Sequence, residues 1–209
     1  APSSDRTGRT PANVIDYAEG TPGVLASGGS DGLVRLWDER SQGCLGTLEV
    51  LGEVNETSFS SCATYLQASS TNNYAVIYDV RRLSAGPLHV LSHGPPASVV
   101  NPTNEDGDER DGPRGITVRP NVVDEGDQGI NTAQWFEGGT RLVTGSGNSS
   151  VAVWDVALGD PMIHWMPRDS HTYAHRRSVN SIAIKPGGHL FASGGDEQKI
   201  LLYDFVRPS

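Results

Sequence analysis

A short unit that ends in an aromatic residue and an aspartate occurs four times, and it limits what this chain can fold into. The clearest copy is LASGGSDGLVRLWDER, residues 25–40, with a polar turn at Asp31-Gly32 and then Trp37-Asp38. Apolar alternation around such a turn predicts two short antiparallel strands. The other copies end at Tyr78-Asp79, Trp154-Asp155 and Tyr203-Asp204.

The spacing of these units predicts a repeat architecture. The aromatic-Asp pairs lie 41, 76 and 49 residues apart, and a period of about 40 residues is typical of four-stranded propeller blades. The middle interval equals one ordinary repeat plus an insertion of roughly 35 residues. The predicted organisation is a flexible lead-in at 1–11, two blades at 12–93, an acidic disordered insertion at 94–129 and two blades at 130–209.

With four such units in frame, the chain resembles the WD-repeat β-propeller family, in a degenerate form. The resemblance covers all but the lead-in and the insertion, and it implies an all-β propeller with four legible blades. The last unit is not followed by a fourth strand, and WD-repeat rings usually close with about seven blades. We therefore expect these blades to belong to a larger ring of about seven. The alternatives are a complete four-bladed ring and a ring completed by a second chain.

Composition narrows the class of partner. The net charge of −9 disfavours nucleic acid as a direct partner, because backbone binding requires a concentrated basic face. No apolar run is long enough to span a bilayer, so no membrane partner is predicted. Cys44 and Cys62 are expected to be small buried thiols rather than a disulfide, which fits a nuclear or cytoplasmic location.

The resemblance also implies a hydrogen-bonded set in each blade: His before the inner strand, Ser or Thr on the second strand, Asp in the turn and Trp on the third. The fourth blade comes nearest, with His175, Ser193, Glu197 and Tyr203. For the other three blades the sets are Ser27, Asp31 and Trp37 (with Thr10 in place of His), Ser69, Asn72 and Tyr78, and Thr144, Asn148 and Trp154. The second and third blades are expected to lack the His. The aspartates Asp38, Asp79, Asp155 and Asp204 complete the structural residues.

No enzyme is predicted from these residues. The Ser of a blade set lies on a buried strand, and the chain has no Gly-x-Ser-x-Gly nucleophile turn. The nearby His164, His171, His175 and Asp169 do not have the closed spacing of a zinc site, so neither a metal nor a cofactor is expected. A channel-bound small molecule or an enzymatic site is the remaining alternative. It would use inner-strand polar residues, which are Asn13, Asp16, Asn55, Asn131, Gln134, Asn180 and Ser181.

Two arginines stand out as partner-binding candidates. Arg40 and Arg81 each follow a blade aspartate by two residues, and Trp37-Asp38-Glu39-Arg40 resembles the WDxR box of cullin-4 substrate receptors. The second copy departs at Asn72 and Tyr78, and the third and fourth blades have Ala157 and Val206 near the arginine position. An arginine there places a planar fork on one face of the propeller, where it suits carboxylates or carbonyls. The alternative is that both arginines only pair with nearby acids.

Two further segments carry binding hypotheses. The insertion holds eight acidic residues and three arginines, so it is either an inert solvated loop or a dock for a basic peptide, and Ile116-Thr117-Val118 in it is a candidate for pairing with a sheet edge. The loop before the last blade is rich in residue types that dominate interfaces. It supplies Trp165, Arg168, Tyr173, Arg176 and Arg177. Alternatively, Trp165 fills the groove between the third and fourth blades.

Together, these patterns predict a non-catalytic protein-interaction scaffold within a multiprotein complex. The alternative function is a cullin-4 substrate receptor that contacts the ligase adaptor through Arg40 and Arg81.

Overall fold

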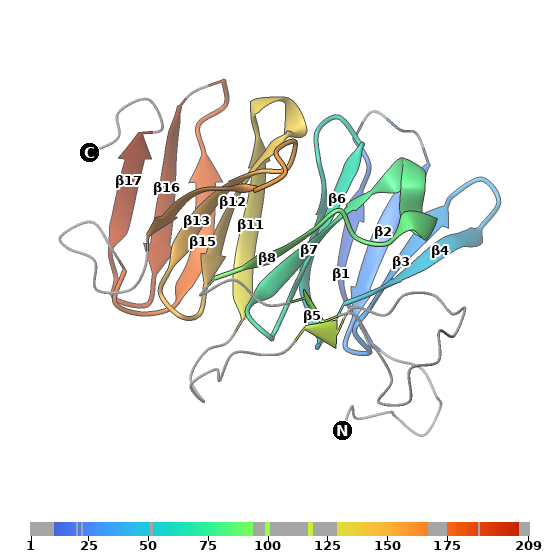
Figure 1. Ribbon diagram of the computed structural model, residues 1–209, viewed down its shortest axis with the longest axis horizontal. Helices are drawn as coiled ribbons and strands as arrows, with labels where there is room; N and C mark the ends of the chain where they lie inside the picture. The colour runs from blue at the N-terminus through green and yellow to red at the C-terminus, as the bar shows by residue number, and fades with distance from the viewer. Residues whose placement is uncertain are drawn as a thin grey trace.

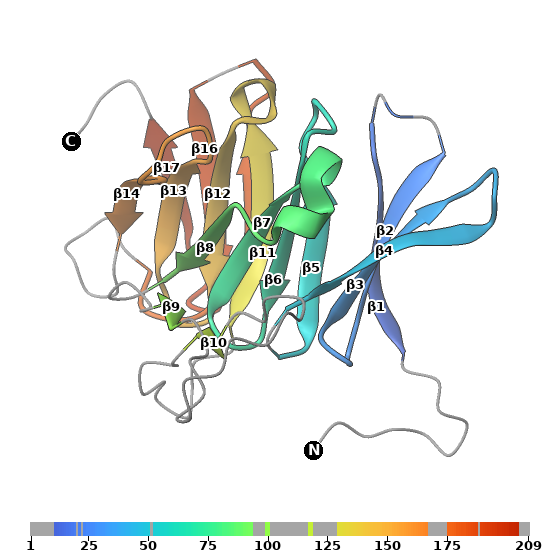
Figure 2. The same ribbon diagram turned by 45° about the vertical axis from the view of Figure 1, so that its right-hand side comes forward.

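The computed structural model describes residues 11–19, 21, 23–50, 52–93, 99–100, 117–118, 129–166, 175–187 and 189–204. Most of these residues form four antiparallel sheets, in which the strands follow one another in chain order. Figures 1 and 2 show the sheets standing side by side, with the first and the fourth at opposite ends of the row. The described part of the chain is thus an open arc rather than a closed four-bladed ring.

Each sheet is a blade built from one repeat. Blade 1 contains β1 (Ala12–Tyr17), β2 (Val24–Gly29), β3 (Leu33–Asp38) and β4 (Gly43–Glu49). Blade 2 contains β5 (Val54–Phe59), β6 (Tyr65–Ser70), β7 (Tyr74–Asp79) and β8 (His89–Ser92), with a 3₁₀ helix, η1 (Val80–Ala85), between the last two.

The other two blades follow the insertion. Blade 3 contains β11 (Ile130–Phe136), β12 (Arg141–Ser146), β13 (Val151–Asp155) and β14 (Met162–Met166), with η2 (Glu137–Gly139) after its first strand. Blade 4 contains β15 (Val179–Ile184), β16 (Leu190–Gly195) and β17 (Ile200–Asp204). In the insertion, β9 (Val99–Val100) pairs with β10 (Thr117–Val118). The expected edge pairing of 117–118 is therefore made with the insertion's own backbone rather than with a blade.

The β-turn between the second and third strands ends in a residue with a positive φ in all four blades. Its last residue has a positive φ: 75° at Gly32, 65° at Asn73, 75° at Ser149 and 63° at Gln198. Glycine and asparagine adopt this left-handed conformation most readily. The repeat is therefore conserved in backbone geometry even where its residue types differ.

The core lies between neighbouring blades. Successive side chains of a strand point to opposite faces, and each blade places small or apolar residues on both. Three clusters result, one at each junction: Val34 and Leu36 meet Leu66 and Tyr78, Ile77 meets Trp154, and Val143 and Val153 meet Ile182 and Phe191. The first strands β1, β5, β11 and β15 contact one another along the inner side of the arc.

Candidate protein-interaction face

Strand topology places the WDxR arginines at one end of the sheets. Within a blade the first and third strands run in the same direction, because each is antiparallel to the second. Their carboxyl ends therefore lie at the same face of the arc, which we call the carboxyl face, and the opposite one is the amino face. Arg40 follows β3 and Arg81 follows β7, so both lie at the carboxyl face.

Arg81 is held by its own blade. Its Nε donates to Asp79 Oδ1 at 3.0 Å and its Nη2 to Asp79 Oδ2 at 2.8 Å, while its backbone N–H also donates to Oδ1. The guanidinium of Arg81 lowers the pKa of Asp79. For Arg81, the structure thus supports the alternative of a local ion pair, although the side chain remains 68% exposed.

The side chain of Arg40 differs from that of Arg81 in its bonding. Only its backbone N–H donates to Asp38 Oδ1, at 3.1 Å, and this bond is the largest cause of the lowered pKa of Asp38. Within the described residues, its side chain makes no hydrogen bond and no ion pair, and the residue is exposed. The Asp38 turn therefore fixes the backbone while leaving the guanidinium available to a partner.

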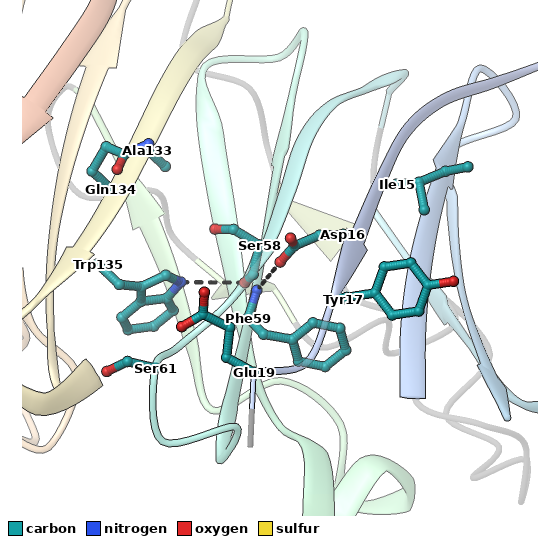
Figure 3. A pocket seen from close by; sticks show the side chains of 10 residues that line it. All are labelled: Ile15, Asp16, Tyr17, Glu19, Ser58, Phe59, Ser61, Ala133, Gln134 and Trp135. Atoms are coloured by element: carbon teal, nitrogen blue, oxygen red, sulfur yellow. Dashed lines mark hydrogen bonds between the residues drawn. The ribbon is translucent and has the colours of Figure 1, made fainter. Parts of the chain in front are cut away.

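A pocket of about 440 Å³ opens at the same face, between the carboxyl ends of β1, β5 and β11 (Figure 3). Asp16 points toward β5, where its Oδ2 accepts the backbone N–H of Phe59 at 2.7 Å, and Trp135 Nε1 donates to the carbonyl of Ser58 at 3.2 Å. The lining includes Asp16 and Glu19 but no basic residue. Its charge suits a cationic or hydrogen-bond-donating group of a partner. Asp16, one of the polar residues named for the alternative of a channel site, thus bonds blade 1 to blade 2.

Of the remaining partner-binding candidates, the three that the structure describes lie away from this face. Arg176 and Arg177 are exposed just before β15, at the amino face, where the N–H of Arg177 donates to Glu197 Oε2 at 3.1 Å. Trp165 lies on the outer edge strand β14 opposite Ala152 and is 43% exposed. It does not fill the groove between blades 3 and 4, since Ile163 and Met166 pack there. Arg168 and Tyr173 lie outside the described residues.

The two cysteines do not lie where the sequence predicted. Cys44 and Cys62 are both free but exposed, so the expectation of buried thiols was wrong. Cys44 is on the outer strand β4 and Cys62 is in the turn after β5.

Some predicted residues lie outside the described part of the chain: His171, Asp169, Thr10, Val206 and most of the acidic insertion. A basic-peptide partner of the insertion therefore stays a prediction. Over the described part of the chain, no group of three metal-ligating residues occurs and no helix is long and apolar enough to cross a bilayer.

The structure reveals a histidine that sequence reasoning missed in blade 3. His93 is fully buried; its Nε2 lies 2.5 Å from Thr144 Oγ1 and its Nδ1 lies 2.6 Å from Ser150 Oγ. Trp154 Nε1 donates to Thr144 Oγ1 at 2.7 Å, and Ser150 Oγ donates to Asn148 Oδ1. The expectation that this blade lacks a histidine was wrong, because His93 precedes the long insertion while its partners follow it.

The hydrogen-bonded set of blade 2 also differs from expectation. Register pairs Ala68 with Val76, as it pairs Ser27 with Arg35 and Thr144 with Ala152. Ala68 therefore occupies the Ser or Thr position, and Ser69, one residue on, faces the other side of the sheet. The Tyr78 hydroxyl donates instead to the carbonyl of Glu49, at 2.8 Å.

In blades 1 and 4, several residues of the expected set are hydrogen-bonded to one another. Trp37 Nε1 donates to Ser27 Oγ at 2.9 Å, and Asp31 pairs with Arg35. In blade 4, His175 contacts Ser193 Oγ at 2.6 Å through Nε2 and Glu197 through Nδ1. His175 and Ser193 are each 1% exposed and therefore lie in the interior of blade 4.

Together, four radial antiparallel sheets with buried His/Ser/Trp sets define a β-propeller repeat protein. The family model for "WD domain, G-beta repeat" matches residues 18–38, 121–155 and 168–204, so these three segments are WD repeats.

Two relatives and one solved structure illustrate what this chain is similar to. Rik1-associated factor 1 of Schizosaccharomyces pombe is 30% identical over 136 residues, covering 64% of this chain and 18% of its own length. WD repeat-containing protein RUP1 of Arabidopsis thaliana is 28% identical, over 91% of this chain and 41% of its own. The chain thus spans less than half the length of these two relatives. The solved structure of the Dos1 propeller superimposes with a TM-score of 0.63 at 18% identity, over 91% of this chain and 40% of that chain, which shows the shared fold.

Proposed function

We propose that this chain is a non-catalytic scaffold that binds other proteins through its carboxyl face, with Arg40 as the central contact, within a multiprotein complex. WD-repeat propellers generally bind other proteins. The observation that carries the proposal is the contrast between two equivalent arginines. Arg81 is clamped by Asp79, whereas the Arg40 guanidinium has no partner among the described residues.

The chemistry of this face suits a polar partner. A free guanidinium offers five N–H donors in a rigid fork, which favours carboxylates and carbonyls. The acidic pocket at the same face favours a cationic or donor group. Complementary charges of both signs on one face specify the orientation of a bound protein more than they add affinity. Among the relatives, Rik1-associated factor 1 is named for its association with another protein.

Affinity purification with two matched variants tests the proposal. Arg40→Ala should remove the proteins that bind the carboxyl face. Arg176→Ala removes an equally exposed arginine from the amino face and should retain them. Mass spectrometry of the co-purified proteins provides the comparison. An unchanged set of partners in Arg40→Ala would contradict the proposal.

The second candidate is a cullin-4 substrate receptor, which the WDxR sequence of Trp37-Asp38-Glu39-Arg40 and the free arginine favour. Binding to a purified cullin-4 adaptor should weaken about thirtyfold in Arg40→Ala, as for a central interface arginine. Arg81→Ala should have less effect, because a partner would first have to displace Asp79. If the wild-type chain does not bind the adaptor while Arg40→Ala still loses other partners, the scaffold proposal stands and the receptor is excluded.

A further inference from the structure

The pocket at the carboxyl face is bounded by three successive blades, and hydrogen bonds between the blades fix its walls. Asp16 of β1 accepts the backbone N–H of Phe59 in blade 2, and Trp135 of blade 3 donates to the carbonyl of Ser58 in blade 2. Figure 3 shows Asp16, Glu19 and Trp135 grouped around these bonds. The pocket therefore spans the two junctions between blades 1, 2 and 3.

The lining of the pocket leaves hydrogen-bond acceptors for a ligand. The Phe59 N–H and the Trp135 indole N–H already donate across the junctions, and the Ser58 hydroxyl donates within blade 2. Among the described residues, none donates a hydrogen bond to Asp16 Oδ1 or to the Glu19 carboxylate, and neither acid forms an ion pair. Two carboxylates with free acceptors, in a lining without a basic residue, favour a cationic donor.

A third carboxyl lies behind the pocket wall. Burial raises the pKa of Glu56 to about 7, the N–H of Ala133 lowers it and the charge of Asp16 raises it further. Because Ala133 and Asp16 both line the pocket, the Glu56 carboxyl lies close to it. Glu56 Oε2 is buried and has no hydrogen-bond partner among the described residues. A positive group in the pocket would therefore interact favourably with a carboxyl at its base as well as with those at its opening.

Two aromatic side chains of the lining narrow the class of cation. Phe59 and Trp135 line the pocket, and the Trp135 ring stacks on Tyr65 with 6.2 Å between the ring centroids. A guanidinium is planar and weakly hydrated, so it stacks on aromatic rings and donates in its plane to carboxylates at the same time. A lysine ammonium is a compact, strongly hydrated charge that gains less from such a site. The combination of rings and carboxylates therefore favours arginine.

The loop between β1 and β2 connects the pocket to Arg40. Glu19 lies near the start of this loop, and the Gly23 carbonyl near its end accepts the backbone N–H of Glu39 at 2.7 Å. Arg40 is the residue after Glu39. Arg40 and the acidic pocket therefore lie on one continuous part of the carboxyl face.

We propose that the acidic pocket receives an arginine side chain of the protein that binds Arg40, an inference that rests on the proposed function. The guanidinium would donate to Asp16 Oδ1 and to the Glu19 carboxylate, with its plane against the Trp135 ring. The partner would carry an acidic group for Arg40 and, beside it, an arginine for the pocket. Two contacts of opposite sign would fix the orientation of the partner on the propeller.

Nuclear magnetic resonance with a small probe tests the pocket directly. The probe is N-acetylarginine amide, and the signal is the Trp135 indole N–H of the isotope-labelled chain, assigned with Trp135→Phe. This signal should shift in a saturable way with a Kd of about 1 mM, as expected for so small a ligand. N-acetylcitrulline amide, which has a similar shape but no charge, and N-acetyllysine amide should each bind about tenfold more weakly. The absence of a saturable shift, or equal binding of either comparison probe, would overturn the inference.

Matched variants locate the binding site. Glu19→Gln removes one exposed carboxylate of the lining and should weaken binding of the arginine probe about fivefold. Asp16→Asn retains an oxygen for the Phe59 N–H, and it should weaken binding about tenfold because Asp16 is less exposed than Glu19. Glu39→Gln is the control, since it removes an exposed acid of the same face that does not line the pocket. Its Kd should be unchanged, and a loss equal to that of Glu19→Gln would contradict the assignment.

Arg40→Ala separates this inference from the proposed function. The variant should bind the arginine probe with unchanged affinity while losing the proteins that co-purify with the wild type. If the probe does not bind and Arg40→Ala still loses those proteins, the pocket inference is wrong and the scaffold proposal stands. If the probe binds and Arg40→Ala retains its partners, the scaffold proposal is wrong, and the pocket does not serve a partner held by Arg40.

Discussion

Blades 2 and 3 share a strand order but are held together by different interactions. In blade 3, Trp154, Thr144, His93 and Ser150 form a continuous buried chain of hydrogen bonds. In blade 2, Ala68 breaks the equivalent chain. Among the described residues, the buried polar atoms without a partner are Glu56 Oε2, Gln67 Nε2 and Ser69 Oγ, and all three belong to blade 2. Both blades have apolar residues packed at their junctions, whereas the continuous hydrogen-bonded set occurs in blade 3 and not in blade 2.

One proton arrangement satisfies every group of the blade 3 set. The Trp154 N–H donates to Thr144, the Thr144 hydroxyl donates to His93 Nε2, the Nδ1–H donates to Ser150, and Ser150 donates to Asn148. This arrangement requires a neutral imidazole with its proton on Nδ1. Burial lowers the pKa of His93 to about 3, consistent with that state.

The largest expected effect is the removal of this histidine. His93→Ala should lower the free energy of unfolding by about 3 kcal/mol, because two buried hydroxyls lose a partner and a cavity remains. His89→Ala is the matched control: its imidazole is part-buried and bonds one carbonyl, that of Val156, so a loss of about 1 kcal/mol is expected. Urea denaturation followed by circular dichroism measures both, and equal losses would contradict the special role of His93.

A lower pH should decrease the free energy of unfolding through the titration of His93. Because its pKa is lowered on folding, the stabilisation is complete above the unfolded value of about 6.5 and declines as the pH falls toward 3. The loss at pH 5 should be about 2 kcal/mol relative to pH 7. Urea midpoints between pH 7 and pH 5 should therefore fall in the wild type and fall less in His93→Ala. Parallel pH profiles for the two proteins would disprove this assignment.

Blade 2 contains a group with the opposite pH dependence. Burial raises the pKa of Glu56 to about 7, the N–H of Ala133 partly offsets this, and the charge of Asp16 adds to it. A carboxyl with a raised pKa stabilises fully below its unfolded value, and that stabilisation is lost as the pH rises through 7.

Glu56→Gln removes this ionisable group. The substitution should stabilise the fold by about 1 to 2 kcal/mol at pH 8, because no charge is then buried. It should change little at pH 5, where the carboxyl is protonated. Thermal unfolding at the two pH values measures the difference, and Glu53→Gln, an exposed neighbour, is the control. Equal effects at both pH values would rule out ionisation as the cause.

The repeat pattern predicted most of the fold, because alternation and turn chemistry act locally. β3, β7, β13 and β17 each end at the aspartate that closes one of the four units found in the sequence. Pairings set by distant parts of the chain were harder to predict. His93 is separated from Thr144 by the insertion, and a one-residue difference in register moved the blade 2 position from Ser69 to Ala68.

The sequence predicted where the candidate residues lie along the strands, but not what their side chains bind. The sequence placed Arg40 and Arg81 after equivalent strands, yet only the structure distinguishes a clamped arginine from a free one. Similarly, the sequence identified Asn13, Asn55, Asn131 and Asn180 only as inner-strand polar residues that a channel site would use. The first three bridge blades, and this role depends on a bulge in each first strand.

The smallest expected effect is the loss of the Tyr78 hydroxyl, which bonds blade 1 instead of a hydrogen-bonded set within blade 2. Tyr78→Phe removes the hydrogen bond to the Glu49 carbonyl and should cost about 1 kcal/mol. Tyr65→Phe is the control, since the Tyr65 ring stacks on Trp135 and no hydrogen bond of its hydroxyl is seen within the described structure. Urea denaturation at pH 7 compares the two. A loss of unfolding free energy in Tyr78→Phe as large as that in His93→Ala would contradict this ranking. The single bond from Tyr78 to blade 1 would then stabilise the fold as much as the hydrogen-bonded set of blade 3, and the two blades would differ in chemistry but not in stability.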